Sequence, residues 1–425
     1  MRITISSPDG LGDFVLRMPL FEALCDAGHD LQIFMRPPAS ELATAAVPAA
    51  RIEKIGEDPY ARLVRFRRSP FAPELRKIAS FAPDLLVIAP FQHSFFDEIC
   101  LSKLPRRLRV AGFRSADAFW GTLANTAPQE LAQRFAMWVE VGAGIPELEK
   151  NRLLAAAILG SPAPKKPLRI APPREAIDGA RSVLRQHGIA EGGYWVVCAG
   201  SRRGLEIKDW GEANWIAALG QIASETQVPL IFLGNEAEAP SIERIRSGLP
   251  KDSEHLNLAH DPPSLLSTFG IIALSAGYVG RDSGPMQLAA ATQRPILAIF
   301  GGSHWGRFFP ESEHAVVVSR GVPCQGCLGY CHLAEPLCVR RVSVQQFLKG
   351  WKLLRSEPAR KILEIPMDAN LRKEIVETAH RRFPRLAHEA QRQVFESGRA
   401  VNLLDSAGFG VRALARGNYR KKFGG

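Results

Sequence analysis

The sequence lacks any long hydrophobic run. No apolar stretch reaches membrane-spanning length without a charged residue. The first ten residues, MRITISSPDG, do not show the basic patch and unbroken apolar segment of a secretory signal. Fixed-period repeats and low-complexity tracts are missing too. These absences argue against a membrane-spanning, secreted or solenoid protein, and we expect a cytoplasmic one.

Cysteine is scarce, with 7 among 425 residues. In a reducing compartment such cysteines are thiols or metal ligands rather than disulfides. The hydrophobic content of 46% and the charged content of 23% are those of an ordinary globular protein. Because domains usually have about 100 to 200 residues, a chain of this length predicts two domains.

Positive charge is concentrated in the last part of the chain. Of the net charge of +11, residues 351–425 supply +8, from 16 Lys and Arg against 8 Asp and Glu. This basic tail could touch anionic lipid at the inner membrane, or serve as a solvated extension or a contact in a homo-oligomer. Few aromatic residues accompany its basic ones, which argues against a nucleic-acid partner.

Short apolar runs alternate with amphipathic segments, a rhythm typical of β-α-β units. The segment SPAPKKP, at 161–167, suits a connector between two α/β domains, at 1–160 and 168–350, and 351–425 looks like a helical basic extension. The carboxyl ends of two such sheets would border a cleft. Strands are expected at 2–7, 31–36, 84–90 and 109–113, and at 194–200, 229–234, 276–282, 295–302 and 315–319.

The first expected strand runs into the turn SSPDGLGD. Gly10 and Gly12 allow a close turn there, and Asp13 stands at or near the start of the following helix. A carboxylate in this place could accept a proton from a substrate hydroxyl. It could equally be an N-cap that only stabilises the helix.

A second turn, GRDSGPMQL, follows the expected strand at 276–282. Pro285 suits the first turn of a helix, so Asp282 or Ser283 falls at the cap, and Gly284 completes a tight turn. Free backbone N–H groups at such a helix start attract phosphate. A capped helix without a ligand would need the same residue types.

Four cysteines, spaced C-x2-C-x3-C-x6-C, fall close together: Cys324, Cys327, Cys331 and Cys338. Four thiolates can close a tetrahedral zinc or iron site, and His332 could replace one ligand. Reduced structural cysteines are the alternative interpretation.

Three motifs in this order, GLGDFVLRMPLFEAL, DSGPMQLAAATQRPILAIFG and PCQGCLGYCHLAEPLCVRRVSVQQFL, resemble glycosyltransferase family 9, the heptosyltransferase family. The resemblance spans residues 1–350 and implies the GT-B fold, in which two Rossmann-like domains face a central cleft. It implies inverting transfer of a heptose from ADP-heptose, a nucleotide-sugar donor, to a lipopolysaccharide inner-core acceptor, with Asp13 as general base. A catalytic metal is not expected, because one base and stabilised phosphates suffice.

The resemblance also implies donor-binding residues in the second domain. Lys208 would neutralise phosphate, Glu236 or Glu238 would hold the ribose, and the remaining candidates are Asp282, Ser283, Gly284 and Gln287. The family often has histidine at the position of Gln287. An amide can donate a hydrogen bond there but supplies no cation.

On the acceptor side the resemblance points to Gly12 and to the basic segment PRRLRVAGFR, with Arg106, Arg107 and Arg109; the stretch RLVRFRRSPF adds further arginines. The cysteine cluster resembles the iron-binding finger of autotransporter heptosyltransferases, so a protein acceptor is a second possibility. A GT-B epimerase or a non-catalytic scaffold is the alternative from another class.

Overall fold

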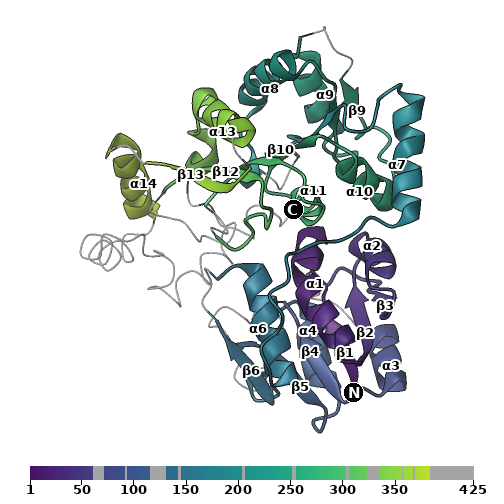
Figure 1. The fold of residues 1–425 in the computed structure, drawn as a ribbon. Helices are drawn as coiled ribbons and strands as arrows, with labels where there is room; N and C mark the ends of the chain where they lie inside the picture. Colours follow the sequence, from purple (N-terminus) through teal and green to yellow (C-terminus); the bar gives the residue numbers. More distant parts are fainter. Residues whose placement is uncertain are drawn as a thin grey trace. The chain divides into compact units, whose positions relative to one another are not determined.

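The computed structural model describes residues 1–60, 71–90, 93–114, 131–141, 145–202, 206–250, 255–302, 306–322, 331, 333, 335–356, 358–366 and 369–382. They form two compact units (Figure 1). The first contains Met1–Ile177 with Leu265–Phe269, and the second contains Asp178–Ser264 and the described residues from Gly270 onward. Both units are α/β, as the sequence predicts.

The division between the units follows residue 177 rather than the proline-rich segment 161–167. The physical reason is that this segment is tied to the first unit. Lys166 pairs with Asp26 at 3.0 Å, and its carbonyl oxygen accepts a hydrogen bond from Arg152 at 2.7 Å. Leu168, directly after the segment, is buried.

The described part of the first unit contains a sheet of six parallel strands in the order β3-β2-β1-β4-β5-β6. The strands are β1 (Arg2–Ser6), β2 (Asp30–Met35), β3 (Arg51–Lys54), β4 (Leu85–Ile88), β5 (Arg109–Arg114) and β6 (Met137–Glu140). The helices are α1 (Leu11–Asp26), α2 (Ala39–Ala46), α3 (Ala72–Phe81), α4 (Phe95–Lys103) and α6 (Glu147–Leu159).

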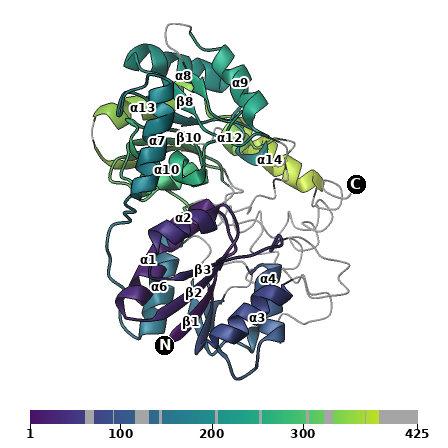
Figure 2. The same cartoon turned by 90° about the vertical axis from the view of Figure 1, so that its right-hand side faces the viewer.

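Helices cover both faces of this first sheet. Figure 2 shows α3 and α4 on the face opposite to α1 and α6. The central strands β1 and β4 are buried almost throughout, which is the reason why their sequences are apolar runs rather than alternating ones. Under α3 and α4 the core is aromatic, with Phe34, Phe71 and Phe96 in contact.

In the second unit, the described residues form seven parallel strands in the order β13-β12-β11-β10-β7-β8-β9. The strands are β7 (Trp195–Cys198), β8 (Leu230–Phe232), β9 (Leu256–Asn257), β10 (Gly277–Arg281), β11 (Ile296–Phe300), β12 (Ala315–Arg320) and β13 (Arg360–Ile365). The helices are α7 (Arg174–Gln186), which begins in the first unit, the 3-10 helix η1 (Glu206–Lys208), α8 (Glu212–Thr226), α9 (Ala239–Ser247), α10 (Leu265–Ala273), α11 (Gly284–Ala291), α12 (Leu337–Arg340), α13 (Val344–Ser356) and α14 (Ala369–Arg382).

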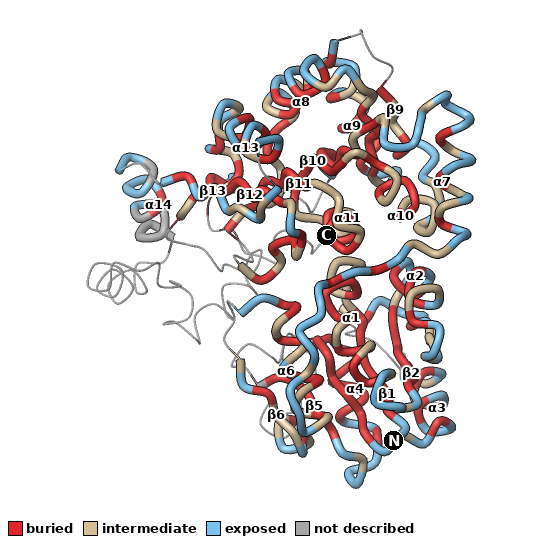
Figure 3. Tube along the Cα trace, in the orientation of Figure 1, coloured by how far each residue is buried: buried red, intermediate tan, exposed pale blue. Residues whose placement is uncertain are grey.

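Helices α8, α9 and α13 pack their apolar faces on this second sheet, and buried residues line the contact (Figure 3). The centre of this core is aromatic: Trp210, Trp215 and Phe347 contact one another at ring distances of 4.7 to 5.5 Å. Such packing of large rings stabilises the unit mainly through buried apolar area.

The two sheets share one topology. In each, the chain runs outward from a central strand, then returns to its other side, so that the order reverses between β1 and β4 and again between β7 and β10. Open α/β sheets bind ligands at the carboxyl ends of the strands at such a reversal. The turns after β1 and β10, which the sequence analysis singled out, lie at these two places.

The prediction that a helical extension begins at residue 351 is wrong, because a helix and a strand of the second unit follow there. Helix α13 crosses this residue, and β13 pairs in parallel with β12 along its whole length, with Ala315 opposite Arg360. Because β13 is an edge strand, its alternating exposure gives it no apolar run to detect. A described helix of the expected kind, α14, comes only after this strand.

No helix in the described ranges is both long and apolar enough to cross a bilayer.

Candidate active site

The turn after β1 places Asp13 in the first turn of α1. Gly10 is the N-cap, with extended backbone and no side-chain cap bond, so Asp13 is not the capping residue. The Asp13 side chain lies beside this glycine, since a methyl group added to Gly10 would be 3.7 Å from Asp13 Oδ2. Gly12 precedes Asp13 in the same turn and, like it, is partly exposed. The structure therefore leaves Asp13 accessible.

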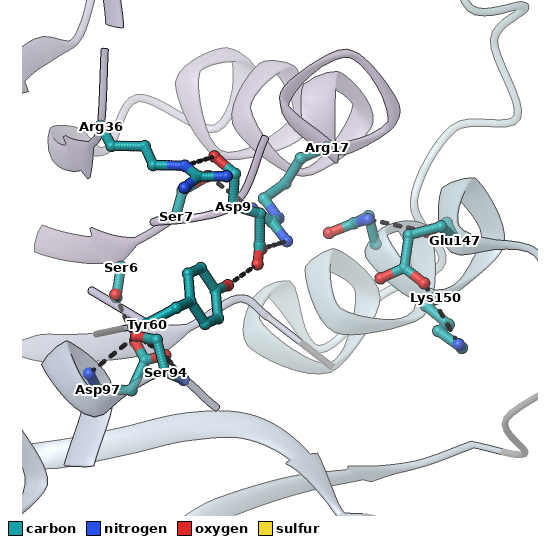
Figure 4. Close-up of polar contacts among 11 residues, drawn as sticks. Ser6, Ser7, Asp9, Arg17, Arg36, Tyr60, Ser94, Asp97, Glu147 and Lys150 are labelled. Atoms are coloured by element: carbon teal, nitrogen blue, oxygen red, sulfur yellow. Dashed lines mark hydrogen bonds and ion pairs between the residues drawn. The ribbon is translucent and has the colours of Figure 1, made fainter. Parts of the chain in front are cut away.

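Asp9 lies at the centre of the hydrogen bonds in this turn (Figure 4). Its carboxylate accepts from Arg17, with Nη2 at 2.6 Å from Oδ2, and from the Tyr60 hydroxyl. Arg17 also donates to Ser7 Oγ at 2.6 Å and is almost fully buried. Burial alone would lower the pKa of Arg17, but the carboxylates of Asp9 and Asp13 hold it above its ordinary value. Both oxygens of Asp9 are thus occupied.

Arg36 brings a second cation to the same turn. It follows β2, the neighbour of β1, and its Nε donates to the Asp9 carbonyl oxygen at 3.3 Å. Its guanidinium lies over the Tyr60 ring, 5.6 Å from the centroid, and its Nη2 would be 3.9 Å from a methyl group on Gly10. Sequence reasoning missed Arg36 and Tyr60. Only the place of Arg36 after a central strand could have indicated it.

Asp97 is a third carboxyl group at this end of the sheet. It accepts from Ser6 Oγ at 2.5 Å, from Ser94 Oγ at 2.7 Å and from the Ser94 N–H at 2.6 Å, forming the capping box of α4. Burial raises the pKa of Asp97 to about 7, against the opposing effect of these hydrogen bonds. Because it is fully buried, Asp97 joins β1 to α4 and does not face substrate.

The structure does not bring the expected acceptor arginines to Asp13. Arg106 and Arg107 precede β5, and Arg109 begins it, opposite Leu85 at the start of β4. Since all the strands are parallel, these exposed arginines lie at the amino edge of the sheet, whereas Asp13 follows the carboxyl end of β1. The arginines of the stretch RLVRFRRSPF lie outside the described residues.

In the second unit, the turn after β10 starts α11 with Ser283 as the N-cap. Its hydroxyl accepts from the Met286 N–H at 3.4 Å and lies 2.9 Å from the Tyr278 hydroxyl. Tyr278 in turn donates to the Arg281 carbonyl oxygen at 2.8 Å. Gly280 makes this possible, because a methyl group there would lie 2.6 Å from the Tyr278 oxygen. Gly284 is the first residue of α11.

Lys208, expected from the resemblance to neutralise phosphate, reaches this turn from η1. Its Nζ lies 2.6 Å from Asp282 Oδ2 and 3.3 Å from the Asp282 carbonyl oxygen. The side chains of Lys208 and Asp282 keep 28% and 13% of their surface exposed. An ammonium group thus stands beside the residue that precedes the N-cap of α11, and N–H groups at the start of a helix favour an anion.

The remaining expected donor residues have different surroundings. Glu238 is buried, pairs with Arg281 and accepts from the Asn235 N–H at 3.2 Å, whereas Glu236 is exposed. Arg281 is also buried, and its Nη1 has no hydrogen-bond partner among the residues that the structure describes. Sequence reasoning missed Arg281.

Gln287 is turned away from the expected role. Its amide nitrogen donates to the Phe308 carbonyl oxygen at 2.7 Å, and the side chain is buried. In this conformation the amide nitrogen fixes the chain at Phe308, and the amide oxygen is buried without a hydrogen-bond partner among the described residues. The geometry gives no support to the prediction that Gln287 contacts phosphate or sugar.

Two of the four clustered cysteines lie in the described part of the chain. Cys331 and Cys338 both pack against a small apolar cluster that includes Leu333 and Leu337. Burial raises the pKa of Cys338 to about 11, and the nearby Cys331 adds to this. Cys324, Cys327 and His332 lie outside the described residues, and within the described ones no group of three or more His, Cys, Asp or Glu could hold a metal ion.

Comparisons with known proteins identify the family of this chain. The family model of glycosyltransferase family 9 (heptosyltransferase) matches residues 119–337, just over half of the chain. Lipooligosaccharide heptosyltransferase 2 of Haemophilus influenzae is 28% identical over 123 residues, which cover 28% of this chain and 35% of that protein. The match therefore spans only about a third of the curated relative's length.

Solved structures of low sequence identity share the fold. A family 9 glycosyltransferase from Veillonella parvula superimposes with a TM-score of 0.61 at 13% identity, over 83% of this chain and 96% of that one. The ADP-heptose lipopolysaccharide heptosyltransferase II of E. coli gives a TM-score of 0.57 at 18% identity, over 83% and 98% of the two chains. Both confirm the predicted two-domain α/β architecture.

Proposed function

The chain belongs to glycosyltransferase family 9, and on this premise we propose that it transfers a heptose from ADP-heptose to a lipopolysaccharide inner-core acceptor. The observation that carries the proposal is the position of Lys208 in the turn that leads into α11, where it pairs with Asp282. A cation beside a helix N-terminus suits the diphosphate of a nucleotide sugar. The heptose and the adenine are inferred from the family and from the activity named for the E. coli structure.

The reaction we propose is a single displacement that inverts the anomeric carbon. An acceptor hydroxyl oxygen forms the new bond to this carbon while the bond to the diphosphate oxygen breaks. ADP leaves with that electron pair, and the hydroxyl proton passes to Asp13. General-base assistance of this kind contributes about 10²- to 10⁴-fold to a rate.

Asp13 suits the role of base better than Asp9 or Asp97. Asp9 has both oxygens engaged by Arg17 and Tyr60, and Asp97 is fully buried. Asp13 keeps an accessible carboxylate in the first turn of α1, with the buried Arg17 guanidinium close enough to act on it electrostatically. In this proposal Asp9, Arg17 and Tyr60 position the turn without taking part in the chemistry.

Charge on the departing diphosphate would be stabilised by Lys208 and by the N–H groups at the start of α11. Fixed donors aimed at developing charge usually give the largest electrostatic term in such reactions. We also propose that Arg36, rather than Arg106, Arg107 or Arg109, contacts an anionic group of the acceptor, because Arg36 lies at the turn that holds Asp13.

We propose a structural iron or zinc at Cys324, Cys327, Cys331 and Cys338. The two described members, Cys331 and Cys338, pack on one apolar cluster, and Cys331 is close enough to act electrostatically on the Cys338 thiol, which supports a shared site. A metal held by the four would cross-link the chain between Cys324 and Cys338. Metal analysis of the purified protein, with Cys331→Ser as the comparison, tests this: about one metal per chain is expected, and a metal-free wild-type protein would contradict it.

The experiment that tests the proposed function measures ADP release and product formation with ADP-heptose and deacylated inner-core acceptors. Acceptor-dependent release that disappears in Asp13→Asn supports the proposal. Asp30→Asn is the control, because Asp30 is an exposed partner of Arg51 at the amino edge of the same sheet. The proposed acceptor would be overturned if ADP were released with a protein acceptor but with none of the core acceptors.

A further inference from the structure

Asp282 is a carboxylate at the place where the proposed donor brings its phosphates. Its Oδ2 lies 2.6 Å from Lys208 Nζ, and the ammonium also donates to its carbonyl oxygen at 3.3 Å. Among the described residues, Asp282 is the one acid within ion-pair distance of Lys208. Together the two side chains carry no net charge, although a diphosphate site calls for a positive one.

This ion pair differs from the other pair at the same turn. Arg281 and Glu238 keep only 8% and 10% of their side-chain surface exposed, whereas Lys208 and Asp282 keep 28% and 13%. Arg281 pairs with Glu238, and Asp282 pairs with Lys208. A ligand can reach Lys208 from solvent, while the Arg281 pair is closed to it.

The Asp282 carboxylate binds the accessible Lys208 ammonium in the way that a phosphate group would. When a diphosphate arrives, it must share Lys208 with Asp282, and the fixed negative charge repels it. The size of this repulsion depends on the charge of the ligand. A terminal phosphate loses its second proton with a pKa of about 6, so at neutral pH a free nucleoside diphosphate carries about one negative charge more than the sugar nucleotide.

We infer that Asp282 occupies Lys208 in the unliganded protein and favours the sugar nucleotide over the more negative nucleoside diphosphate that transfer leaves behind. In this role Asp282 distinguishes the donor from the product and speeds release of the product, and it takes no part in the chemistry at the anomeric carbon. The inference rests on the proposed function only in assuming that the donor is a nucleotide sugar; it does not depend on which base or sugar the donor carries.

The test is calorimetric binding of ADP and of ADP-heptose to wild type and to Asp282→Asn, in EDTA at neutral pH. The variant should bind ADP about tenfold tighter and ADP-heptose about threefold tighter, from the loss of one unit charge a few ångströms away. Glu212→Gln is the matched control, since it removes the same charge from an ion pair with Arg244 in the same unit. It should change neither affinity.

If Asp282 served only to hold the turn in shape, Asp282→Asn should bind both ADP and ADP-heptose more weakly than wild type, because the turn would be disturbed. Equal or weaker binding of ADP by Asp282→Asn would therefore overturn the inference. So would a gain in wild-type affinity on adding Mg²⁺ that the variant lacks, since Asp282 would then be a metal ligand.

The inference and the proposed function can fail separately. If GDP or UDP binds wild type and ADP does not, the proposed donor is wrong. The same comparison, made with that nucleotide and its sugar derivative, still decides the role of Asp282. If wild type binds no nucleoside diphosphate, both are overturned.

Discussion

The first six strands of each sheet have the same order, yet the turns at the two reversal points carry different charges. After β1, a buried cation, Arg17, supports an acidic turn in which Asp13 is accessible. After β10, a buried ion pair between Arg281 and Glu238 supports a turn in which the accessible cation is Lys208. Open α/β sheets bind ligands at such reversal points. In the proposed function, the side chains gathered at each point make the first turn a proton acceptor and the second an anion site.

The largest expected effect comes from removing the acid of the first turn. Asp13→Asn should lower kcat by about 10²- to 10⁴-fold and leave the KM for the donor nearly unchanged, because the proposed base acts on the acceptor hydroxyl. Steady-state kinetics at saturating acceptor measures this. A loss that appears mainly in the donor KM would contradict the division of labour between the two turns.

The buried supports should matter for stability in both units. Arg17→Met leaves the partly buried Asp9 without the cation paired with its carboxylate, and Arg281→Met leaves the buried Glu238 without its cation. Each should lower the free energy of unfolding by about 3 to 5 kcal/mol, as expected when one partner of a buried pair is removed. Denaturant titration checks it, with the exposed Arg51→Met as control. Changes below about 1 kcal/mol would mean that these pairs behave like surface pairs.

Removing the cation of the second turn should act on the donor. Lys208→Met should raise the KM for the nucleotide sugar and lower kcat/KM by about tenfold to a hundredfold, the range of a lost charge-assisted contact. Lys166→Met removes an exposed lysine from the first unit and is the control. If the variant matched the wild-type rate at every donor concentration, the proposed contact of Lys208 with the donor would be contradicted.

The smallest effect is a pH dependence of stability that belongs to the first unit. Since burial raises the pKa of Asp97 from 3.8 to about 7, the folded protein holds a proton that the unfolded chain has released between these values. The stabilising contribution of this group is therefore present at low pH, and the free energy of unfolding falls as pH rises toward about 7, by at most about 1.4 kcal/mol for each pH unit. Unfolding of Asp97→Asn should lack this fall, and an identical pH profile would contradict the assignment.

The sequence predicted the central strands and missed the edges. All nine predicted strand segments contain a strand, whereas β3, β6, β9 and β13 were not anticipated. These four are the outer strands of the two sheets, and sequences such as RIEK and RKILEI alternate between polar and apolar residues or are very short. A strand buried on both faces leaves an apolar run, and an edge strand does not.

The candidate site divides in a similar way. Asp13, Lys208, Asp282 and Ser283 were predicted because they directly follow strands or resemble a family motif, and the structure places them at the reversal points. Arg36, Tyr60 and Arg281 were missed, because their contacts join segments that are distant in sequence. Arg109 was predicted to bind the acceptor from its charge alone, because the sequence does not show at which edge of the sheet it lies.

The most direct test of the account is calorimetric titration of ADP into Asp13→Asn and Lys208→Met. The account predicts that Asp13→Asn, although inactive in transfer, binds ADP with wild-type affinity, while Lys208→Met binds it about tenfold more weakly. Weaker ADP binding by Asp13→Asn, or unchanged binding by Lys208→Met, would contradict the assignment of proton transfer to the first turn and anion binding to the second.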